Sequence, residues 1–402
     1  MEVKTLISAD NTIALWAMVI GVVCLANILD QRYKWANKLS IVVMCILGGA
    51  ILGNLHIMPY SAGVYKGISG TLLYLAIPML LFKSNVRRLV RDGGRVFGAF
   101  HIAAGATVIS ALIYGFILKN FEIDNLAGLV AMMSGGHIGG TVNMVAMAGV
   151  FAVDDTMMGA ATVVGNASLG ILLAILAFIC NSKFVRKHLT HPHIEAREAE
   201  ILADPEALNR PLSAAFWKNR ELSLLDLLKT LSTAFAIVAV SKYIAGWVTS
   251  MNPPYLIQQL FGSIYLIMTS LTVIGATLLP GWFSKLKFGD ELGMIILTMW
   301  YVTIGLSADI KTLLANTASV IFIIAITIVV HIIVVLPVGK LFKLNLEELC
   351  CGISASFGGP SSSVALTINQ GWKDLIAPSI VCALWGYVIG NYVAVFLGNI
   401  FL

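Results

Sequence analysis

The stretch SASFGGPSSSVALT, residues 354–367, decides the fold of this chain because it breaks an otherwise apolar helix with two glycines, a proline and five serines. Around it, 58% of the 402 residues are hydrophobic and only 12% are charged. Apolar runs of about 20 residues match the ~30 Å of hydrocarbon that a transmembrane helix crosses. The sequence therefore predicts an all-α polytopic membrane protein, and the absence of long alternating strands argues against a transmembrane β-barrel.

Two of twelve apolar segments, 126–150 and 346–370, are interrupted at the centre by glycine and small polar residues. Each half spans about ten residues and reaches only the middle of the bilayer, so the segment either crosses as a discontinuous helix or turns back as a hairpin. The hairpin alternative places most of the 26 Lys and Arg on the cytoplasmic side, as the positive-inside rule requires. We therefore predict two re-entrant hairpins and ten crossings, at 11–28, 39–54, 67–82, 96–118, 157–180, 224–247, 259–280, 289–306, 318–338 and 375–401.

This topology places both termini outside a cell (inner or plasma) membrane and the 181–223 loop in the cytoplasm. The first apolar segment lacks a basic region and a small-residue cleavage site before it, so we interpret it as a retained span rather than a signal peptide. The six cysteines show no CxxC or Cys/His spacing and are interpreted as packing residues. The basic residues lie in loops and report orientation, not a nucleic-acid partner.

The two interruptions also resemble each other. Shifted by 219 residues, GGTVNMVAMAGVFAVDD (139–155) overlies GGPSSSVALTINQGWKD (358–374) and pairs Gly140 with Gly359. We infer two inverted repeats, 1–180 and 224–402, each with about five transmembrane helices and one interrupted segment, joined by the 181–223 linker. Inverted repeats whose broken helices meet at the midplane are typical of secondary transporters.

Broken backbone survives at membrane depth only inside protein or against a watery cavity. The second half of each interrupted segment begins near Thr141 or Pro360 and points a positive helix end at the midplane, while carbonyl ends near Ser134 and Ala355 could hold a cation. The predicted substrate-binding residues are Gly136, His137, Gly139, Gly140, Thr141, Asn143, Gly358, Gly359, Ser361, Ser362 and Ser363. The predicted metal ligands, for Na⁺, are Ser134, Asn166, Ser354, Ser356 and Asn391.

Simpler interpretations of the same residues remain open. The serines could repair broken backbone or let helices approach closely, and Asn166 and Asn391 could hydrogen-bond between helices. We interpret His101 and His331 as structural and expect Asp155 to cap the helix that follows it. No Asp or Glu lies in the middle of a clearly apolar span. Because a Na⁺/H⁺ exchanger usually has a carboxylate inside the membrane, this absence argues against Na⁺/H⁺ exchange as the main activity.

The glycine interruptions IGG (138–140) and FGGPSSS (357–363), with the ending GWKDLIAPSIVCALWGYVIGNYVAVFLG (371–398), resemble the domain of unknown function 819 family. The resemblance implies membership of the cation:proton antiporter and anion transporter superfamily, beside the bile acid, glutamate and 2-hydroxycarboxylate sodium symporters. SGGH (134–137) is similar to a re-entrant motif of sodium/glutamate symporters, but Ile138 then departs from it, so glutamate specificity does not follow. The resemblance also implies a homodimer.

The sequence predicts a secondary active transporter in the lipid bilayer, a sodium-coupled symporter of a small organic anion such as an amino acid, short peptide or carboxylate. Alternating access is the predicted mechanism, with Na⁺ as the coupling ion and no cofactor. The alternatives are a proton-coupled transporter or an exporter, then a channel or an intramembrane hydrolase. We expect the protein not to be an enzyme, because neither serine run forms a GxSxG elbow.

Overall fold

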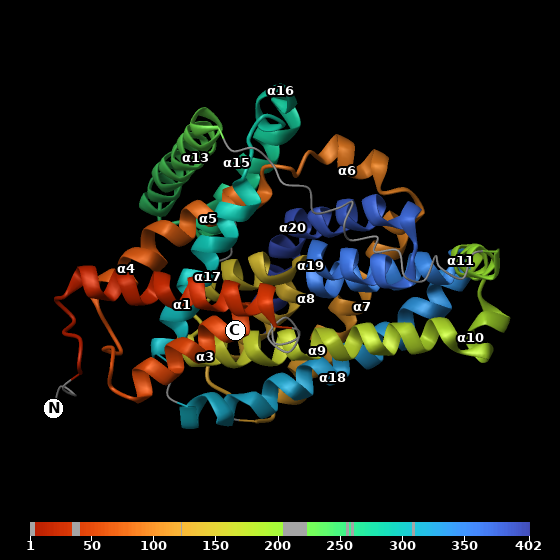
Figure 1. The fold of residues 1–402 in the computed structure, drawn as a ribbon, viewed down its shortest axis with the longest axis horizontal. Coiled ribbons are helices and arrows are strands. Elements are labelled where there is room, and N and C mark those ends of the chain that lie inside the picture. Colours follow the sequence, from red (N-terminus) through yellow and green to blue (C-terminus); the bar gives the residue numbers. More distant parts are fainter. Residues whose placement is uncertain are drawn as a thin grey trace.

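The computed structural model describes residues 5–33, 41–121, 123–203, 223–254, 257–258, 261–307 and 310–402. Every regular element in these ranges is a helix (Figure 1). The first half holds α1 (Thr12–Arg32), α3 (Ile41–Asn54), α4 (Gly63–Gly67), η1 (Ile68–Leu72), α5 (Leu73–Leu81), α6 (Val86–Asp92), α7 (Gly94–Leu118), α8 (Leu126–Val150) and α9 (Asp155–Asn181). The linker holds α10 (Lys183–His188) and α11 (Pro192–Ala203). The second half holds α13 (Leu224–Ser250), α15 (Ile264–Leu278), α16 (Pro280–Phe283), α17 (Gly289–Ser307), α18 (Ile310–Leu341), α19 (Leu346–Gln370), η3 (Lys373–Leu375) and α20 (Ile376–Asn399).

The helices agree with a multi-pass membrane protein. Within the described ranges, seven helices are long and apolar enough to cross a membrane, and α3 and α15 are shorter apolar helices. Each of the ten segments predicted to cross contains helix among its described residues, the third of them as α4, η1 and α5 in succession, but α17 is not among these apolar helices. Part of the 181–223 linker, residues 204–222, lies outside the described residues.

The first interrupted segment, α8, folds back on itself. Asn125, at its start, donates a hydrogen bond of 2.8 Å from Nδ2 to the carbonyl oxygen of Phe151, at its end. A Cβ on Gly135 would lie 3.0 Å from Cγ of Met147, although twelve residues of straight helix would separate these positions by about 18 Å. The segment is therefore a hairpin whose two arms lie side by side.

The second interrupted segment, α19, folds back in the same way. Ser362 Oγ donates to the carbonyl oxygen of Ser354 at 2.8 Å, across eight residues that would span about 12 Å in a straight helix. Its first turn and the residue after its end both contact α11, through Glu347 and Gly371. The first arm of this hairpin thus begins, and the second arm ends, against the linker helix α11.

The hairpins lie together near the centre of the molecule (Figure 1). The first packs against α20, and the second packs against α7, α8, α9 and α20.

The N-cap of α9 is a different residue from the one expected. Asp154, not Asp155, is the N-cap of α9: its Oδ1 accepts from the backbone N–H groups of Thr156 and Met157 at 3.0 and 2.9 Å. Asp155 is the first residue of the helix, so the prediction was displaced by one position.

The basic loops are joined to one another by polar contacts. Lys83 pairs with Asp290, and Lys287 pairs with Asp226 at 2.9 Å. Arg95, in the first turn of α7, pairs with Glu348 at 2.8 Å, which connects the basic segment 83–95 to the first turn of α19. Thr190 donates to Asn345 at 2.7 Å and connects the linker to the same region. Loops that carry most of the positive charge of the described chain therefore lie in one connected network.

Candidate binding site

The tips of the two hairpins share one backbone conformation. Gly140 has φ 68° and ψ −164°, and Gly359 has φ 73° and ψ −161°. This region of φ and ψ is essentially restricted to glycine because a side chain would clash with the backbone. Two glycines paired by the sequence shift thus produce the same break at equivalent places.

The tips also contact each other. A Cβ on Gly140 would lie 3.5 Å from the Cα of Gly359. Ser356 Oγ, in the second hairpin, donates to the carbonyl oxygen of His137 at 2.7 Å, and Thr107 Oγ1 on α7 donates to the same oxygen at 3.1 Å. The break at Gly139 and Gly140 interrupts the helical hydrogen bonds here, so side chains from two other elements satisfy this carbonyl.

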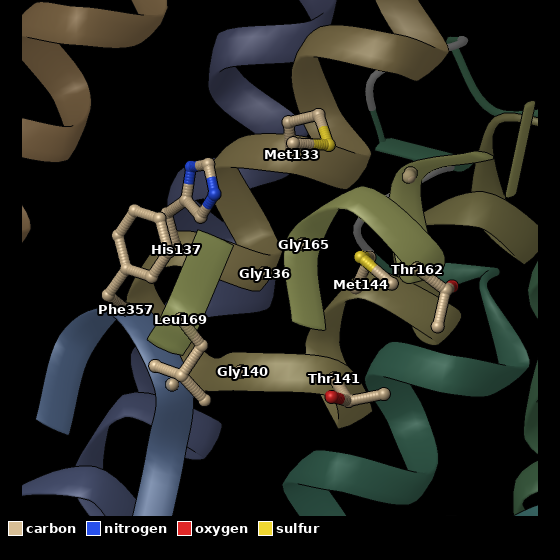
Figure 2. Close-up of a pocket in the computed structure, with 12 residues that line it drawn as sticks. Met133, Gly136, His137, Gly140, Thr141, Met144, Thr162, Gly165, Leu169 and Phe357 are labelled. Carbon is tan, nitrogen blue, oxygen red and sulfur yellow. The ribbon is translucent and has the colours of Figure 1, made fainter. Parts of the chain in front are cut away.

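A cavity of about 100 Å³ lies beside the tips, between the first hairpin, α9 and the tip of the second hairpin (Figure 2). A 150 Å³ cavity of this kind can hold a benzene molecule, so this one has room for a ligand group of about four heavy atoms. Among the described residues, its lining contains neither Lys, Arg, Asp nor Glu. The lining residues are Met133, Gly136, His137, Gly140, Thr141, Met144, Ala161, Thr162, Gly165, Leu169, Phe357 and Gly358.

His137 supplies the ring nitrogens of this cavity. Its ring stacks on Phe357 with centroids 4.3 Å apart and an interplanar angle of 17°. The side chain is buried, and Nδ1 has no hydrogen-bond partner among the described residues. A buried polar atom without a partner costs about 1–3 kcal/mol, which a bound ligand or water would recover. Figure 2 shows the stacked rings on one side of the cavity and the Thr141 and Thr162 hydroxyls on another.

Five of the predicted substrate-binding residues line the cavity: Gly136, His137, Gly140, Thr141 and Gly358. Gly359 lies at the contact between the tips. Gly139 and Asn143 face α20 instead, where Asn143 Nδ2 donates to the carbonyl oxygen of Gly386 at 3.1 Å. The side chain of Ser361 lies outside the described residues.

Two predicted serines of the second tip bind backbone carbonyl oxygens. Ser362 Oγ and Ser363 Oγ both reach the carbonyl oxygen of Gly359, at 2.9 and 3.0 Å, as helical serines bind the carbonyl three or four residues earlier. Ser362 Oγ also donates to the carbonyl oxygen of Ser354 across the break, at 2.8 Å. That contact of Ser362 fits the simpler interpretation, backbone repair.

The predicted metal ligands do not converge through any described contact. Ser134 Oγ donates to Ala131 in its own helix at 3.2 Å, and Asn391 Nδ2 donates to Thr269 Oγ1 at 3.3 Å. Ser354 Oγ and Asn391 Oδ1 are buried without a partner among the described residues. The side chain of Asn166 lies outside the described residues. Free oxygens suited to a cation are thus present, but at separate points.

Several residues of the site carry no sequence signal of their own. Met133, Met144, Leu169 and Phe357 line the cavity but follow the pattern of ordinary apolar helix residues. His331, interpreted as structural, binds Thr327 through Nδ1 at 2.8 Å, and its Nε2 lies 3.3 Å from Thr107 Oγ1. The Thr107 hydroxyl also donates to the carbonyl oxygen of His137, so His331 contacts the site indirectly, through Thr107.

Comparison with known proteins assigns the chain to a family. The sequence profile of a family described as "Protein of unknown function (DUF819)" matches residues 14–402. The chain belongs to this family. It is also 33% identical over 397 residues to the "Uncharacterized membrane protein YjcL" of Bacillus subtilis (strain 168), covering 99% of this chain and 98% of the relative. The resemblance inferred from IGG, FGGPSSS and the C-terminal stretch is confirmed at the level of the family.

Proposed function

We propose that this DUF819 protein is a secondary active transporter that carries a small organic anion by alternating access. One observation carries the proposal: two hairpin tips with the same glycine conformation meet beside a partly open cavity whose described lining carries no charged residue. Non-helical backbone at membrane depth is typical of places where a protein handles a solute.

The arrangement of the two halves supports an inverted repeat. Gly140 and Gly359 are related by the sequence shift and share their dihedral angles. His137 and Ser356 are related by the same shift of 219 and bind each other. A pseudo-twofold axis between the tips would bring equivalent residues together in this manner.

The basic loops support the proposed orientation. Four of them contact one another through Lys83, Arg95, Lys287 and the linker, as loops on a single side of a membrane would. The excess of positive charge favours the cytoplasm for that side, and we propose that the N- and C-termini lie outside. The first hairpin would then enter from outside and the second from the cytoplasm.

An anionic substrate suits the polar part of the cavity. The second arm of the first hairpin begins at Thr141, which lines the cavity, so the positive end of that half-helix faces the space. His137 adds ring nitrogens, and the described part of the lining contains no carboxylate that would repel an anion. We propose Na⁺ as the coupling ion, and the buried hydroxyl oxygen of Ser354, which lacks a partner among the described residues, is the candidate ligand at the second hairpin. One Na⁺ driven by ~100 mV supplies about 2.3 kcal/mol.

The described serines do not support a hydrolase. Ser356, Ser362 and Ser363 donate to backbone carbonyl oxygens, and Ser356 binds the carbonyl of His137 rather than its ring. A nucleophilic serine requires a base within hydrogen-bond reach of its hydroxyl. We therefore propose that the protein is not an enzyme and needs no cofactor, and we keep the homodimer as part of the proposal.

Uptake into proteoliposomes tests the proposal. Radiolabelled amino acids, short peptides and carboxylates are screened under an imposed inward Na⁺ gradient, and the expected result is saturable uptake with countertransport. Gly359→Leu should abolish it, because leucine cannot adopt the backbone at φ 73°, while Gly246→Leu, at a helix position with open space around it, should retain it. Uptake that does not depend on Na⁺ but depends on a pH gradient would mean that H⁺ is the coupling ion. Normal uptake by Gly359→Leu would disprove the proposed site.

A further inference from the structure

A second hollow of the described chain lies away from the hairpin tips, at the junction of α10 and α11. It is a groove of about 530 Å³ lined by residues 186–192 together with Glu195 and Asn345. Arg186, Lys187, His188 and His191 give it an excess of basic groups. Glu195 is the one carboxylate among the described lining residues, and its Oε1 lies 3.5 Å from His191 Nε2.

The charges of this groove are not all neutralised within the described chain. Arg186 is held in place, with Nε donating to the carbonyl oxygen of Cys180 at 2.6 Å and Nη1 to Glu198 at 2.7 Å. Lys187 is exposed and forms no ion pair with any described residue. Lys183, Lys340 and Lys343 add exposed ammonium groups on the flanking segments. A binding partner with negative charge would complement this surface.

The groove lies where a lipid headgroup would be found. α9 is long and apolar enough to cross a membrane and ends at Asn181, two residues before α10 begins. Large apolar side chains beside the basic groups are exposed: Phe184 is 74% accessible, Leu341 80% and Phe342 68%. The neighbouring loops are held together by a hydrogen bond of 2.9 Å from Leu346 N to the carbonyl oxygen of Thr190. Cationic groups beside exposed apolar side chains at the end of a span suit an anionic phospholipid. The phosphate would contact the cationic groups, and the acyl chains would contact the apolar side chains.

We propose that the groove between α10 and α11 binds the headgroup of an anionic phospholipid. Lys187 and His188 contact the phosphate, Arg186 positions α10, and the acyl chains lie along Phe184, Leu341 and Phe342. The bound lipid bridges the linker to the loop at the start of α19, because Asn345 belongs to both the groove and that loop. A membrane lipid thus stabilises the junction against which both arms of the second hairpin rest.

Native mass spectrometry of delipidated protein in a neutral detergent tests this site. Dioleoyl-phosphatidylglycerol is compared with dioleoyl-phosphatidylcholine, and inorganic phosphate is added separately. Wild-type protein should retain phosphatidylglycerol in preference to phosphatidylcholine. Lys187→Gln should lower its affinity about fivefold, the factor that corresponds to about 1 kcal/mol per basic residue at an anionic surface. Lys187→Arg should restore it, and Glu195→Gln should raise it.

The matched control is Lys119→Gln, an exposed lysine at the opposite end of α7 from the basic segment 83–95, which should leave lipid binding unchanged. Equal retention of the two lipids, or an equal loss with Lys119→Gln, would overturn the proposal. Displacement of phosphatidylglycerol by millimolar inorganic phosphate would also overturn it, because the site would then bind a small anion rather than a lipid.

Discussion

Ser356 Oγ donates a hydrogen bond of 2.7 Å to the carbonyl oxygen of His137, and 219 positions separate the two residues. The same shift relates Gly140 to Gly359, whose dihedral angles agree within 5° in φ and 3° in ψ. The contact therefore joins positions that correspond to each other in the two interrupted segments. A hydrogen bond between two such positions holds the hairpin tips at a fixed separation beside the cavity.

Replacing Ser356 by alanine tests the importance of this contact. The variant leaves the buried carbonyl of His137 with Thr107 as its one remaining described side-chain donor, and we expect a stability loss of about 1 kcal/mol together with slower transport. Thermal unfolding in detergent and proteoliposome uptake measure the two effects. Ser168→Ala is the control, because Ser168 Oγ donates at 2.7 Å to Gly165 within its own helix. Equal effects of the two variants would mean that the link between the hairpins is unimportant.

Gly165 allows the cavity to be filled without straining the backbone. It lines the cavity, its φ is helical, and no heavy atom lies within 4 Å of an added Cβ. Gly165→Leu should therefore fold and insert normally but lose substrate binding at least tenfold, because the side chain occupies the space. Gly170→Leu, on the same helix and with the same open surroundings, should behave as wild type. Substrate-induced thermal stabilisation measures binding, and a normal response from Gly165→Leu would place the substrate elsewhere.

The sequence predicts the hairpins but only one wall of the cavity. Gly140 and Gly359 reveal the breaks because a pair of glycines weakens a continuous helix inside an apolar run, and the distribution of basic residues favours a chain that turns back. The wall formed by α9 cannot be predicted in this way, since Ala161, Thr162 and Leu169 follow the same pattern as any buried helix face. Ser362 and Ser363 illustrate a second ambiguity of the sequence: a hydroxyl suited to a ligand is equally suited to a backbone carbonyl, and both of these hydroxyls reach the carbonyl of Gly359.

His137 is expected to affect binding more than folding. Its ring is buried against Phe357, so His137→Phe can keep the stacking while it removes both nitrogens. We expect a rise in KM for uptake of about tenfold with little change in unfolding temperature, because Nδ1 has no described partner to lose. His101→Gln is the control, since His101 binds Trp385 at 3.0 Å on the exposed side of α7. A large fall in stability with unchanged KM would show that His137 is a packing residue.

Cys180 and Cys350 offer a direct test of movement between α9 and the second hairpin. Their Sγ atoms lie 3.6 Å apart, both are buried, and they join the end of α9 to the first turns of α19. Copper phenanthroline should remove two electrons and two protons from the thiols and form a disulfide. If the hairpin moves against α9 during alternating access, oxidation should reduce uptake at least tenfold, and dithiothreitol should restore it. Cys350→Ala should make uptake insensitive to the oxidant. Full uptake by protein whose disulfide is verified by mass spectrometry would show that α9 and the hairpin move as one body.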